Sequence, residues 1–194
     1  MTIDVIVARH NEDISWTKGI LPDRRLVVYT KNVDLPNVGR EAATYLNHIV
    51  KNRDKLADWT FFCQANPVYH CRNFVEIVNG FPDTELQCVL FNAGGPSFYV
   101  DKPVRNLEIN PPGDDLKNDC RGLWSGLFKG NMPEDILFAP CSIFGISRKR
   151  LLSRSVNFYW QAVLLACSRP RGPWEFERLW SYLWRDKDTA FVRC

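Results

Sequence analysis

An apolar run at Trp59–Cys63, preceded by an amphipathic helix pattern, constrains the fold more than any other feature of the sequence. Its side chains are apolar toward both faces, as in a central strand that helices cover on either side. Before it, apolar residues recur at intervals of three, four and seven, the spacing of a core-facing helix stripe. They are Ala42, Tyr45, Leu46, Ile49, Val50 and Leu56. We expect Asn37 to cap this helix, because its side-chain oxygen can accept a hydrogen bond from a free amide of the first turn.

Polar residues follow each of the first three expected strands. The strand Ile3–Ala8 ends in Arg-His-Asn-Glu-Asp, the strand Leu26–Tyr29 ends in Lys-Asn, and the central strand ends in Gln-Ala-Asn-Pro. Open α/β sheets bind ligands at the carboxyl ends of their strands. The sequence therefore predicts a ligand site at the end of the central strand. A ligand loop is also possible after the first strand, but there Asp13 as a cap of the following turn is favoured.

The rest of the chain continues the alternation of strands and helices. Helix patterns occupy 68–79, 148–152, 156–167 and 174–184, the last opened by Pro173, and strand patterns occupy 86–91 and 142–146. Ser147 is placed to cap the first helix after the last strand. Residues 93–119 are rich in Gly and Pro, so we expect long loops there, with a short strand at 98–100. This order predicts an α/β domain with a mostly parallel central sheet flanked by helices.

Composition limits the classes of protein to consider. The 194 residues are 45% hydrophobic, which suits one domain with a full core. The net charge of +3 is spread along the chain, which gives no case for nucleic acid. Seven cysteines without paired spacing indicate reduced thiols in a cytoplasmic protein. The longest apolar run is too short for a transmembrane segment, and no signal segment is apparent.

Several side-chain groups allow a structural and a functional interpretation. The tryptophans at 160, 174, 180 and 184 are either core residues or a stacking wall for a sugar ring, and the core interpretation is favoured. His70, Cys71 and Cys63 suggest a metal or thiol site, but their spacing favours ordinary structural residues. A structural hydrogen bond is expected for His48 on the helix before Trp59–Cys63, which we call the organising helix.

Several short words of the sequence resemble known proteins. Asn37-Val38-Gly39-Arg40-Glu41, followed by a helix and a buried strand, resembles the nucleotide-sugar-binding half of GT-A glycosyltransferases. As a set, the words also resemble a family of small uncharacterised proteins, largely fungal, that looks GT-A-like. These words are 7–16, 37–41, 45–49, 143–148 and 177–180. The resemblance implies a single GT-A-like domain over 1–194, with a nucleotide-sugar-binding half (1–92), a loop-rich insert (93–130) and an acceptor-side half (131–194).

The resemblance also assigns residues to a nucleotide-sugar donor such as a UDP-sugar. The N-terminal loop would border the nucleoside, and the basic residues would face the diphosphate, with Arg148, Lys149 and Arg150 as further cations or as a solvated helix face. The implied binding residues are Ala8, Arg9, Asn11, Glu12, Lys31, Asn37, Gly39, Arg40, Gln64, Ala65, Asn66 and Arg148.

The metal position departs from the GT-A pattern. Gln64, Ala65 and Asn66 occupy the place of the Asp-x-Asp motif. Mn²⁺ and Mg²⁺ prefer charged oxygen ligands, and these side chains offer only neutral amides. We therefore expect no required cofactor, with Asn66 as a weak candidate metal ligand. Arginine and lysine side chains would stabilise the leaving diphosphate instead.

An inverting transfer also requires a carboxylate that accepts the proton of the acceptor hydroxyl. Glu177 and Glu175 are the candidates, and they point to nearly opposite sides of a helix. Arg171 and Arg178 suggest a surface ion pair for Glu175, whereas Trp174 and Trp180 suggest a drier setting for Glu177. We expect Glu177 to be the base, with a buried hydrogen bond as its structural alternative. Three carboxylates of the insert are further candidates: Asp114, Asp115 and Asp119.

The sequence thus predicts a glycosyltransferase that moves a sugar from a nucleotide-diphosphate donor to a carbohydrate hydroxyl, with inversion. The alternative is a catalytically silent module that binds a nucleotide or a glycan, which the missing acidic pair favours.

Overall fold

The computed structural model describes residues 1–194 except 83, 93–119, 135, 137–139, 185–187 and 194. Strands and helices alternate along the described chain. The elements are β1 (Ile3–Arg9), η1 (Ser15–Gly19), β2 (Arg24–Thr30), α1 (Arg40–Lys51), η2 (Arg53–Lys55), β3 (Trp59–Gln64), α2 (Pro67–His70), α3 (Phe74–Asn79), β4 (Cys88–Asn92), α4 (Cys120–Leu127), η3 (Pro140–Ser142), β5 (Phe144–Ser147), α5 (Arg148–Leu152), α6 (Val156–Ser168), α7 (Gly172–Trp184) and β6 (Thr189–Arg193).

Six strands form one mixed sheet in the order β2-β1-β3-β5-β4-β6. β1 lies between β2 and β3 and is parallel to both, and β4 is parallel to β6. β5 lies between β3 and β4 and runs antiparallel to both. The prediction of an α/β domain with a mostly parallel sheet is confirmed. The reversed β5 was not predicted, because an apolar run has the same pattern in either strand direction.

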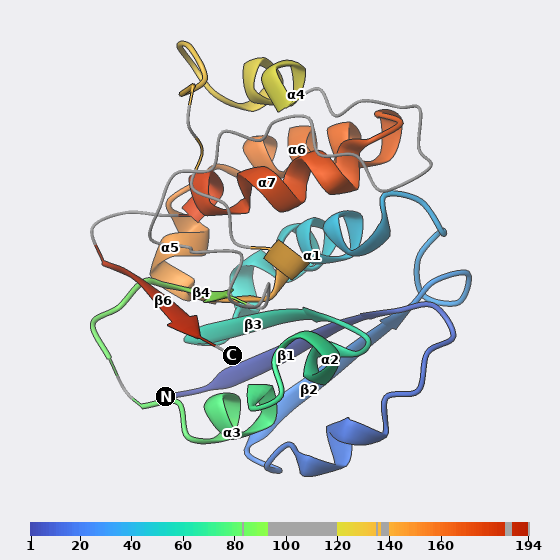
Figure 1. The fold of residues 1–194 in the computed structure, drawn as a ribbon, viewed down its shortest axis with the longest axis vertical. Helices are drawn as coiled ribbons and strands as arrows, with labels where there is room; N and C mark the ends of the chain where they lie inside the picture. The colour runs from blue at the N-terminus through green and yellow to red at the C-terminus, as the bar shows by residue number, and fades with distance from the viewer. Residues whose placement is uncertain (83, 93–119, 135, 137–139, 185–187, 194) are drawn as a thin grey trace.

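Helices cover both faces of the sheet. α1, α6 and α7 lie on one face, and α3 and η1 lie on the other (Figure 1). β3 contributes to the core on each side: the ring centroids of Phe62 and Tyr45 are 5.2 Å apart on one face, and those of Phe61 and Phe81 are 5.0 Å apart on the other. Trp59–Cys63 is buried throughout, which confirms the two-sided central strand.

The organising helix α1 confirms the apolar stripe but begins later than predicted. The stripe residues Ala42, Tyr45, Leu46 and Ile49 are buried, and Val50 is partly buried. The prediction that Leu56 belongs to this helix is wrong, because α1 ends at Lys51 and Leu56 is buried after η2. The N-cap is Gly39, whose φ of 63° is left-handed, and a Cβ at that position would lie 2.6 Å from the Cβ of Ala43. The prediction that Asn37 caps the helix is wrong, because the chain turns through a backbone conformation that glycine adopts without strain.

The other elements match the predicted pattern with two additions and one division: the single helix predicted after Pro67 is two short helices, α2 and α3. Ser147 caps α5 as predicted, since its Oγ accepts a hydrogen bond from the backbone N–H of Arg150 at 3.1 Å. The sequence analysis missed β6, which extends the sheet beside β4, and α4. Because α4 lies inside 93–130, the prediction of a loop-rich insert is wrong for residues 120–127. The predicted strand at 98–100 and the carboxylates Asp114, Asp115 and Asp119 lie outside the described residues.

The core interpretation is correct for two of the four C-terminal tryptophans. Trp180 and Trp184 are buried, with their rings stacked at a centroid distance of 5.2 Å. Trp174 is partly buried, and Trp160 on α6 is exposed. The aromatic core between α7 and the sheet therefore uses the second half of the cluster.

The cysteines differ from the prediction at one position. The described free thiols are Cys63, Cys88, Cys120, Cys141 and Cys167. Cys71 is disulfide-bonded, so the expectation that all the cysteines are reduced is wrong there. Disulfides are typical of oxidising compartments. The disulfide of Cys71 therefore weakens the prediction of a cytoplasmic location, which was based on reduced cysteines. Within the described ranges, no helix is both long and apolar enough to cross a bilayer.

His48 on α1 couples the stability of the fold to pH. Its Nδ1 lies 3.0 Å from the hydroxyl of Tyr29, and its buried Nε2 has no hydrogen-bond partner. Burial lowers the pKa of His48 from 6.5 to about 4, against an opposing effect of Asp4. The predicted structural role of this histidine is confirmed by its hydrogen bond, and its protonation is disfavoured in the folded state.

The free energy of unfolding is therefore expected to fall as the pH falls from 6.5 to about 4. Across that window the unfolded chain binds a proton that the folded chain does not, which costs about 3 kcal/mol in total. Urea unfolding at pH 7, 5.5 and 4.5 measures this for the protein and for His48→Gln. The difference in stability between the two should narrow toward acid. Parallel curves would contradict the assignment to His48.

Candidate functional site

A pocket lies where the chain reverses its direction across the sheet. From β1 the chain reaches β2 through η1 on one face, and from β2 it reaches β3 through α1 on the other (Figure 1). Such a change of face leaves a crevice at the carboxyl ends of the strands between the two connections. The pocket in this crevice has a volume of about 360 Å³. It is lined by Ala8, Arg9, His10, Glu12, Lys31, Asn37, Arg40, Glu41, Gln64, Ala65, Asn66, Tyr69 and His70.

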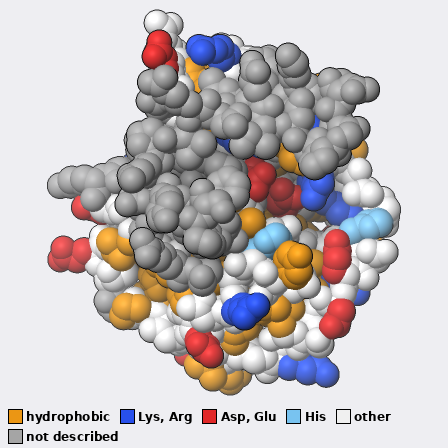
Figure 2. Space-filling view, in the orientation of Figure 1, with side chains coloured by type: hydrophobic (Ala, Val, Ile, Leu, Met, Phe, Trp, Pro, Cys, Tyr) orange, Lys and Arg blue, Asp and Glu red, His pale blue; other side chains and the backbone are white. Residues whose placement is uncertain are grey.

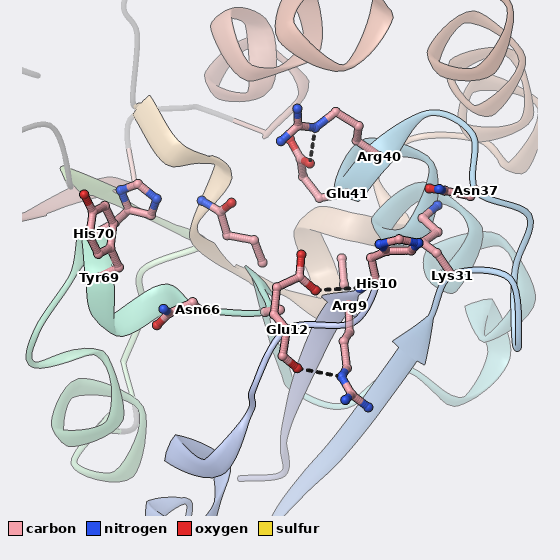
Figure 3. A pocket seen from close by; sticks show the side chains of 13 residues that line it. Arg9, His10, Glu12, Lys31, Asn37, Arg40, Glu41, Asn66, Tyr69 and His70 are labelled. Carbon is pink, nitrogen blue, oxygen red and sulfur yellow. Dashed lines mark hydrogen bonds and ion pairs between the residues drawn. The ribbon is translucent and has the colours of Figure 1, made fainter.

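Charged side chains of both signs surround this pocket. In Figure 2 acidic, basic and histidine side chains gather around a hollow beside the grey atoms. In Figure 3 Arg40 and Glu41 lie on one side of the cavity and Glu12 on the opposite side. Lys31 and Asn37 close a third side. The pocket thus presents cations and carboxylates to the same small volume.

The loop after β1 is folded around the Glu12 carboxylate. Its Oε2 accepts hydrogen bonds from the backbone N–H groups of His10 at 2.7 Å and Asn11 at 3.1 Å. The Arg9 Nε donates to the Glu12 carbonyl at 2.9 Å. Burial raises the pKa of Glu12, but the backbone hydrogen bonds together lower it by a larger amount. The pKa of Glu12 is therefore below its ordinary value. Glu12 therefore acts as an ionised structural group of this loop.

Lys31 places a cation in the wall of the pocket. The residue is buried, and its Nζ donates a hydrogen bond to the Val38 carbonyl at 3.0 Å. Burial lowers the pKa of Lys31, while Cys167 and Glu41 oppose that shift. An ammonium group has three donors. Two of them are left for a ligand after the bond to Val38.

Arg40 and Glu41 open α1 at the mouth of the pocket. The Arg40 Nε lies 3.4 Å from the Glu41 Oε2, and its guanidinium lies over the Trp174 ring, 4.9 Å from the centroid. The side chain of Arg40 is 56% exposed and that of Glu41 is 15% exposed. Burial raises the pKa of Glu41, and Arg40 opposes this. The arginine is thus held by weak contacts that an anionic ligand could replace.

The end of β3 supplies neutral polar groups. The Gln64 Nε2 donates a hydrogen bond to the Cys141 carbonyl at 3.1 Å, and the Trp16 Nε1 donates to the Ala65 carbonyl at 2.7 Å. Asn66 is exposed at the start of α2 and makes no side-chain cap hydrogen bond. In the described part of the chain, no three His, Cys, Asp or Glu residues form a group able to hold a metal.

The segment Cys141–Ser142, which forms the floor beneath Gln64 by accepting its hydrogen bond, has a strained backbone. Cys141 and Ser142 have φ values of 76° and 50°, which residues other than glycine rarely adopt. Backbone N–H of Cys141 donates to the Glu177 Oε1 at 2.7 Å, and its Sγ lies 3.3 Å from the His70 Nδ1. Burial and the nearby Glu177 raise the pKa of Cys141 to about 12. Cys141 is therefore a protonated thiol, which is a poor nucleophile.

Most of the donor-binding residues predicted from the sequence line this one pocket. These are Ala8, Arg9, Glu12, Lys31, Asn37, Arg40, Gln64, Ala65 and Asn66. Asn11 and Gly39 are their neighbours but do not line it. The structure places Arg148 at the other end of β3, where its backbone N–H donates to the Asp58 carbonyl at 2.8 Å. Binding of a donor by these residues stays a prediction.

The two predicted base candidates lie outside the pocket lining. Glu175 is buried and its Oε2 lies 2.6 Å from the Arg169 Nε, so the predicted surface ion pair is wrong. Glu177 makes the hydrogen bond to Cys141, which was its structural alternative. The loop that the resemblance placed at the nucleoside includes His10, but the sequence analysis missed Glu41, Tyr69 and His70 as lining residues. Glu41 follows Arg40 directly, and this adjacency was the signal that could have found it.

A second cavity of about 310 Å³ lies beside the first and shares Arg40 with it. The turn before α1 and the connection from α6 to α7 line it. Its members are Val38, Gly39, Arg40, Ala166, Cys167, Ser168, Arg169, Pro170, Pro173 and Trp174. Arg40 therefore lies between the two cavities.

Comparisons with known proteins add one finding. Residues 5–81 match the family model described as "Protein of unknown function (DUF3431)". The DUF3431 match runs from β1 to just beyond α3, and so includes the residues that line the pocket. No curated protein and no solved structure matched the chain. The match agrees with the resemblance to an uncharacterised family over these residues, and it carries no link to glycosyltransferases.

Proposed function

We propose that the protein binds a nucleotide-diphosphate sugar in the pocket at the ends of β1 and β3, and transfers the sugar to a carbohydrate hydroxyl. The observation that carries this proposal is the meeting of Lys31 and Arg40 at the switch point of the sheet. Both are cations with free donors, and the position is the one where open α/β sheets bind nucleotides. An arginine fork and an ammonium group suit a diphosphate.

The lining residues divide the pocket into two parts. The loop after β1 forms one wall of the pocket and is held in place by its own hydrogen bonds. Ala8, Arg9 and Glu12 in this wall would border the nucleoside. The diphosphate would lie between Lys31 and Arg40. The cavity of about 360 Å³ falls within the range of small-molecule sites.

Metal dependence is a separate part of the proposal. The end of β3 offers the amides of Gln64 and Asn66, and the first of these is already hydrogen-bonded to Cys141. Neutral amides are weak ligands for Mn²⁺ or Mg²⁺. We propose that Lys31 and Arg40 stabilise the charge of the leaving diphosphate in place of a metal. Binding that is unchanged by EDTA supports this, and a strict requirement for Mn²⁺ refutes it.

A catalytically silent nucleotide- or glycan-binding module is the second candidate. Two observations favour it. The Glu12 carboxylate accepts hydrogen bonds from backbone amides, and the Glu177 carboxylate accepts one from the backbone N–H of Cys141, so neither is free to act as a base. A module would bind a nucleotide without releasing a product.

A thermal-shift panel separates these outcomes. UDP-glucose, GDP-mannose, dTDP-glucose and a CMP-sugar are tested with Mn²⁺ and with EDTA. A ligand at a hundredfold excess over its Kd adds about 2.7 kcal/mol of stability, or about 5–10 °C in Tm. Stabilisation by one nucleotide class supports the pocket, and no shift with any member refutes it. Slow release of the free nucleotide from the bound nucleotide sugar then distinguishes the enzyme from the binding module.

A further inference from the structure

Two carboxylates line the pocket, and the structure gives them different tasks. Glu12 accepts two backbone hydrogen bonds from its own loop, at 2.7 and 3.1 Å. Glu41 lies on the first turn of α1, and its carboxylate accepts a hydrogen bond from its own backbone N–H. Among the described residues its side-chain partner is Arg40, whose Nε is 3.4 Å from its Oε2, a longer contact than those of Glu12. In Figure 3 the Glu41 side chain lies beside the cavity, next to Arg40. Glu41 is therefore the lining carboxylate that is still available to a ligand.

Glu177, the base expected from the sequence, is less suited to that task. It does not line the pocket, and its Oε1 accepts the 2.7 Å hydrogen bond from the backbone N–H of Cys141. That bond helps to hold a segment with two positive φ values. Taking a proton on this carboxylate would weaken a contact that supports the pocket floor. The geometry thus assigns Glu177 a positioning role.

We infer that Glu41 is the catalytic base of the pocket, a conclusion that rests on the proposed glycosyl transfer. When the donor binds, its diphosphate takes the guanidinium of Arg40, and the Glu41 carboxylate is released toward the acceptor hydroxyl. Glu41 accepts the proton of that hydroxyl while the acceptor oxygen forms the new bond to the anomeric carbon. The bond between that carbon and the diphosphate oxygen breaks, and the diphosphate leaves with the electron pair.

The surroundings of Glu41 suit proton transfer. The charged and titratable groups that act on it are Arg40 on its own helix, Lys31 after β2, Tyr45 one turn further along α1 and Glu177 on α7. Burial, and to a smaller degree the negative charge of Glu177, raise the pKa of Glu41 above its ordinary value, although Arg40 lowers it. A base is most effective when its pKa approaches the working pH. When Arg40 binds the donor diphosphate and no longer contacts Glu41, the pKa of Glu41 is therefore expected to rise.

Glu41→Gln tests this inference with a matched control. Glu76 also lies in the first turn of a helix, α3, but is exposed and does not line the pocket. Glu76→Gln therefore repeats the loss of a first-turn carboxylate away from the site. The rate of hydrolysis of the nucleotide sugar that gives the largest thermal shift is measured from pH 5 to 9. We expect Glu41→Gln to lower this rate by about 10²–10⁴-fold without weakening the binding of the nucleotide.

The pH profile provides a second readout. In the unmodified protein the rate should fall below the pKa of Glu41, and Glu41→Gln should lack that acid limb. Glu41→Asp, which keeps a carboxylate, should retain the limb at a reduced rate and decides the question if Glu41→Gln does not fold. Glu177→Gln should change the rate by less than tenfold, because its amide oxygen can still accept the hydrogen bond from Cys141.

The outcomes separate this inference from the proposed function. No thermal shift with any nucleotide sugar refutes both. Nucleotide binding without hydrolysis leaves the binding module standing and overturns Glu41 as a base. Hydrolysis that survives in Glu41→Gln and disappears in Glu177→Gln restores Glu177 and overturns the inference.

Discussion

Replacing Arg40 by alanine is expected to weaken the binding of a nucleotide diphosphate by about 10- to 150-fold. A hydrogen bond to a charged group contributes about 1.5–3 kcal/mol, and each 1.4 kcal/mol is a factor of ten in affinity. Arg40 is suited to this role because its present partners, Glu41 at 3.4 Å and the Trp174 ring at 4.9 Å, hold it weakly. Isothermal titration calorimetry with UDP or GDP, whichever stabilises the protein, measures the loss.

Arg148→Ala is the matched control for this experiment. It removes the same charge at the opposite end of β3, where Arg148 hydrogen-bonds to Asp58 and lies outside the pocket. We expect its affinity to stay within threefold of the unmodified protein. Equal losses in both variants would mean that net charge, and not the pocket, governs binding.

Gly145→Ala should lower the free energy of unfolding by about 3 kcal/mol, which is the upper end of the cost of overpacking a core. Gly145 lies on β5 opposite Phe61 of β3, and a Cβ there would be 2.6 Å from the Phe61 ring. That ring cannot move aside, because it is buried against Phe81 and Phe91. Tm should fall by about 6–12 °C for a domain of this size. Differential scanning calorimetry measures the change.

Gly126→Ala makes the same substitution where the neighbour can yield. A Cβ at Gly126 would meet the Cδ1 of Leu165 at 2.9 Å, the flexible end of a side chain. Alanine also favours the helical backbone of α4 by about 0.5–1 kcal/mol. We expect no loss of stability in this variant. A Tm for Gly145→Ala as high as that of Gly126→Ala would contradict the close contact between β3 and β5.

The sequence was most informative where one physical rule governs several residues. Burial on both faces makes β3 apolar throughout, and the polar residues after β1, β2 and β3 follow from the meeting of parallel strand ends at one edge. Both patterns are local. The pattern of β3 predicted a ligand site at its end, and the resemblance to an uncharacterised family assigned most of the other residues that line the pocket. The α1 stripe is local in the same sense.

What the sequence could not supply depends on contacts between distant segments. Glu177 appeared to be in a dry setting because of Trp174 and Trp180, but the Cys141 segment, far away in the chain, takes its carboxylate. Arg148 follows a strand, as the ligand-site residues do, yet β5 runs in the opposite direction and carries it to the other end of the sheet. Strand direction cannot be read from an apolar run.

The start of α1 is a similar case. Asn37 has the side chain of a cap residue, but the backbone reverses at Gly39 in a left-handed conformation, and helix entry follows the backbone. The same turn places Arg40 and Glu41 at the mouth of the pocket. A shift of the helix start by two residues thus decides which side chains the cavity receives.

The most direct test is a crystal structure of the protein grown with the nucleotide sugar that stabilises it most. The proposal predicts that the diphosphate lies in the crevice at the carboxyl ends of β1 and β3, within hydrogen-bond distance of Lys31 and Arg40. The Glu41 carboxylate should then lie within hydrogen-bond distance of the acceptor hydroxyl. A ligand in the second cavity beside Trp174, or a pocket that stays empty while the nucleotide binds elsewhere, would contradict it.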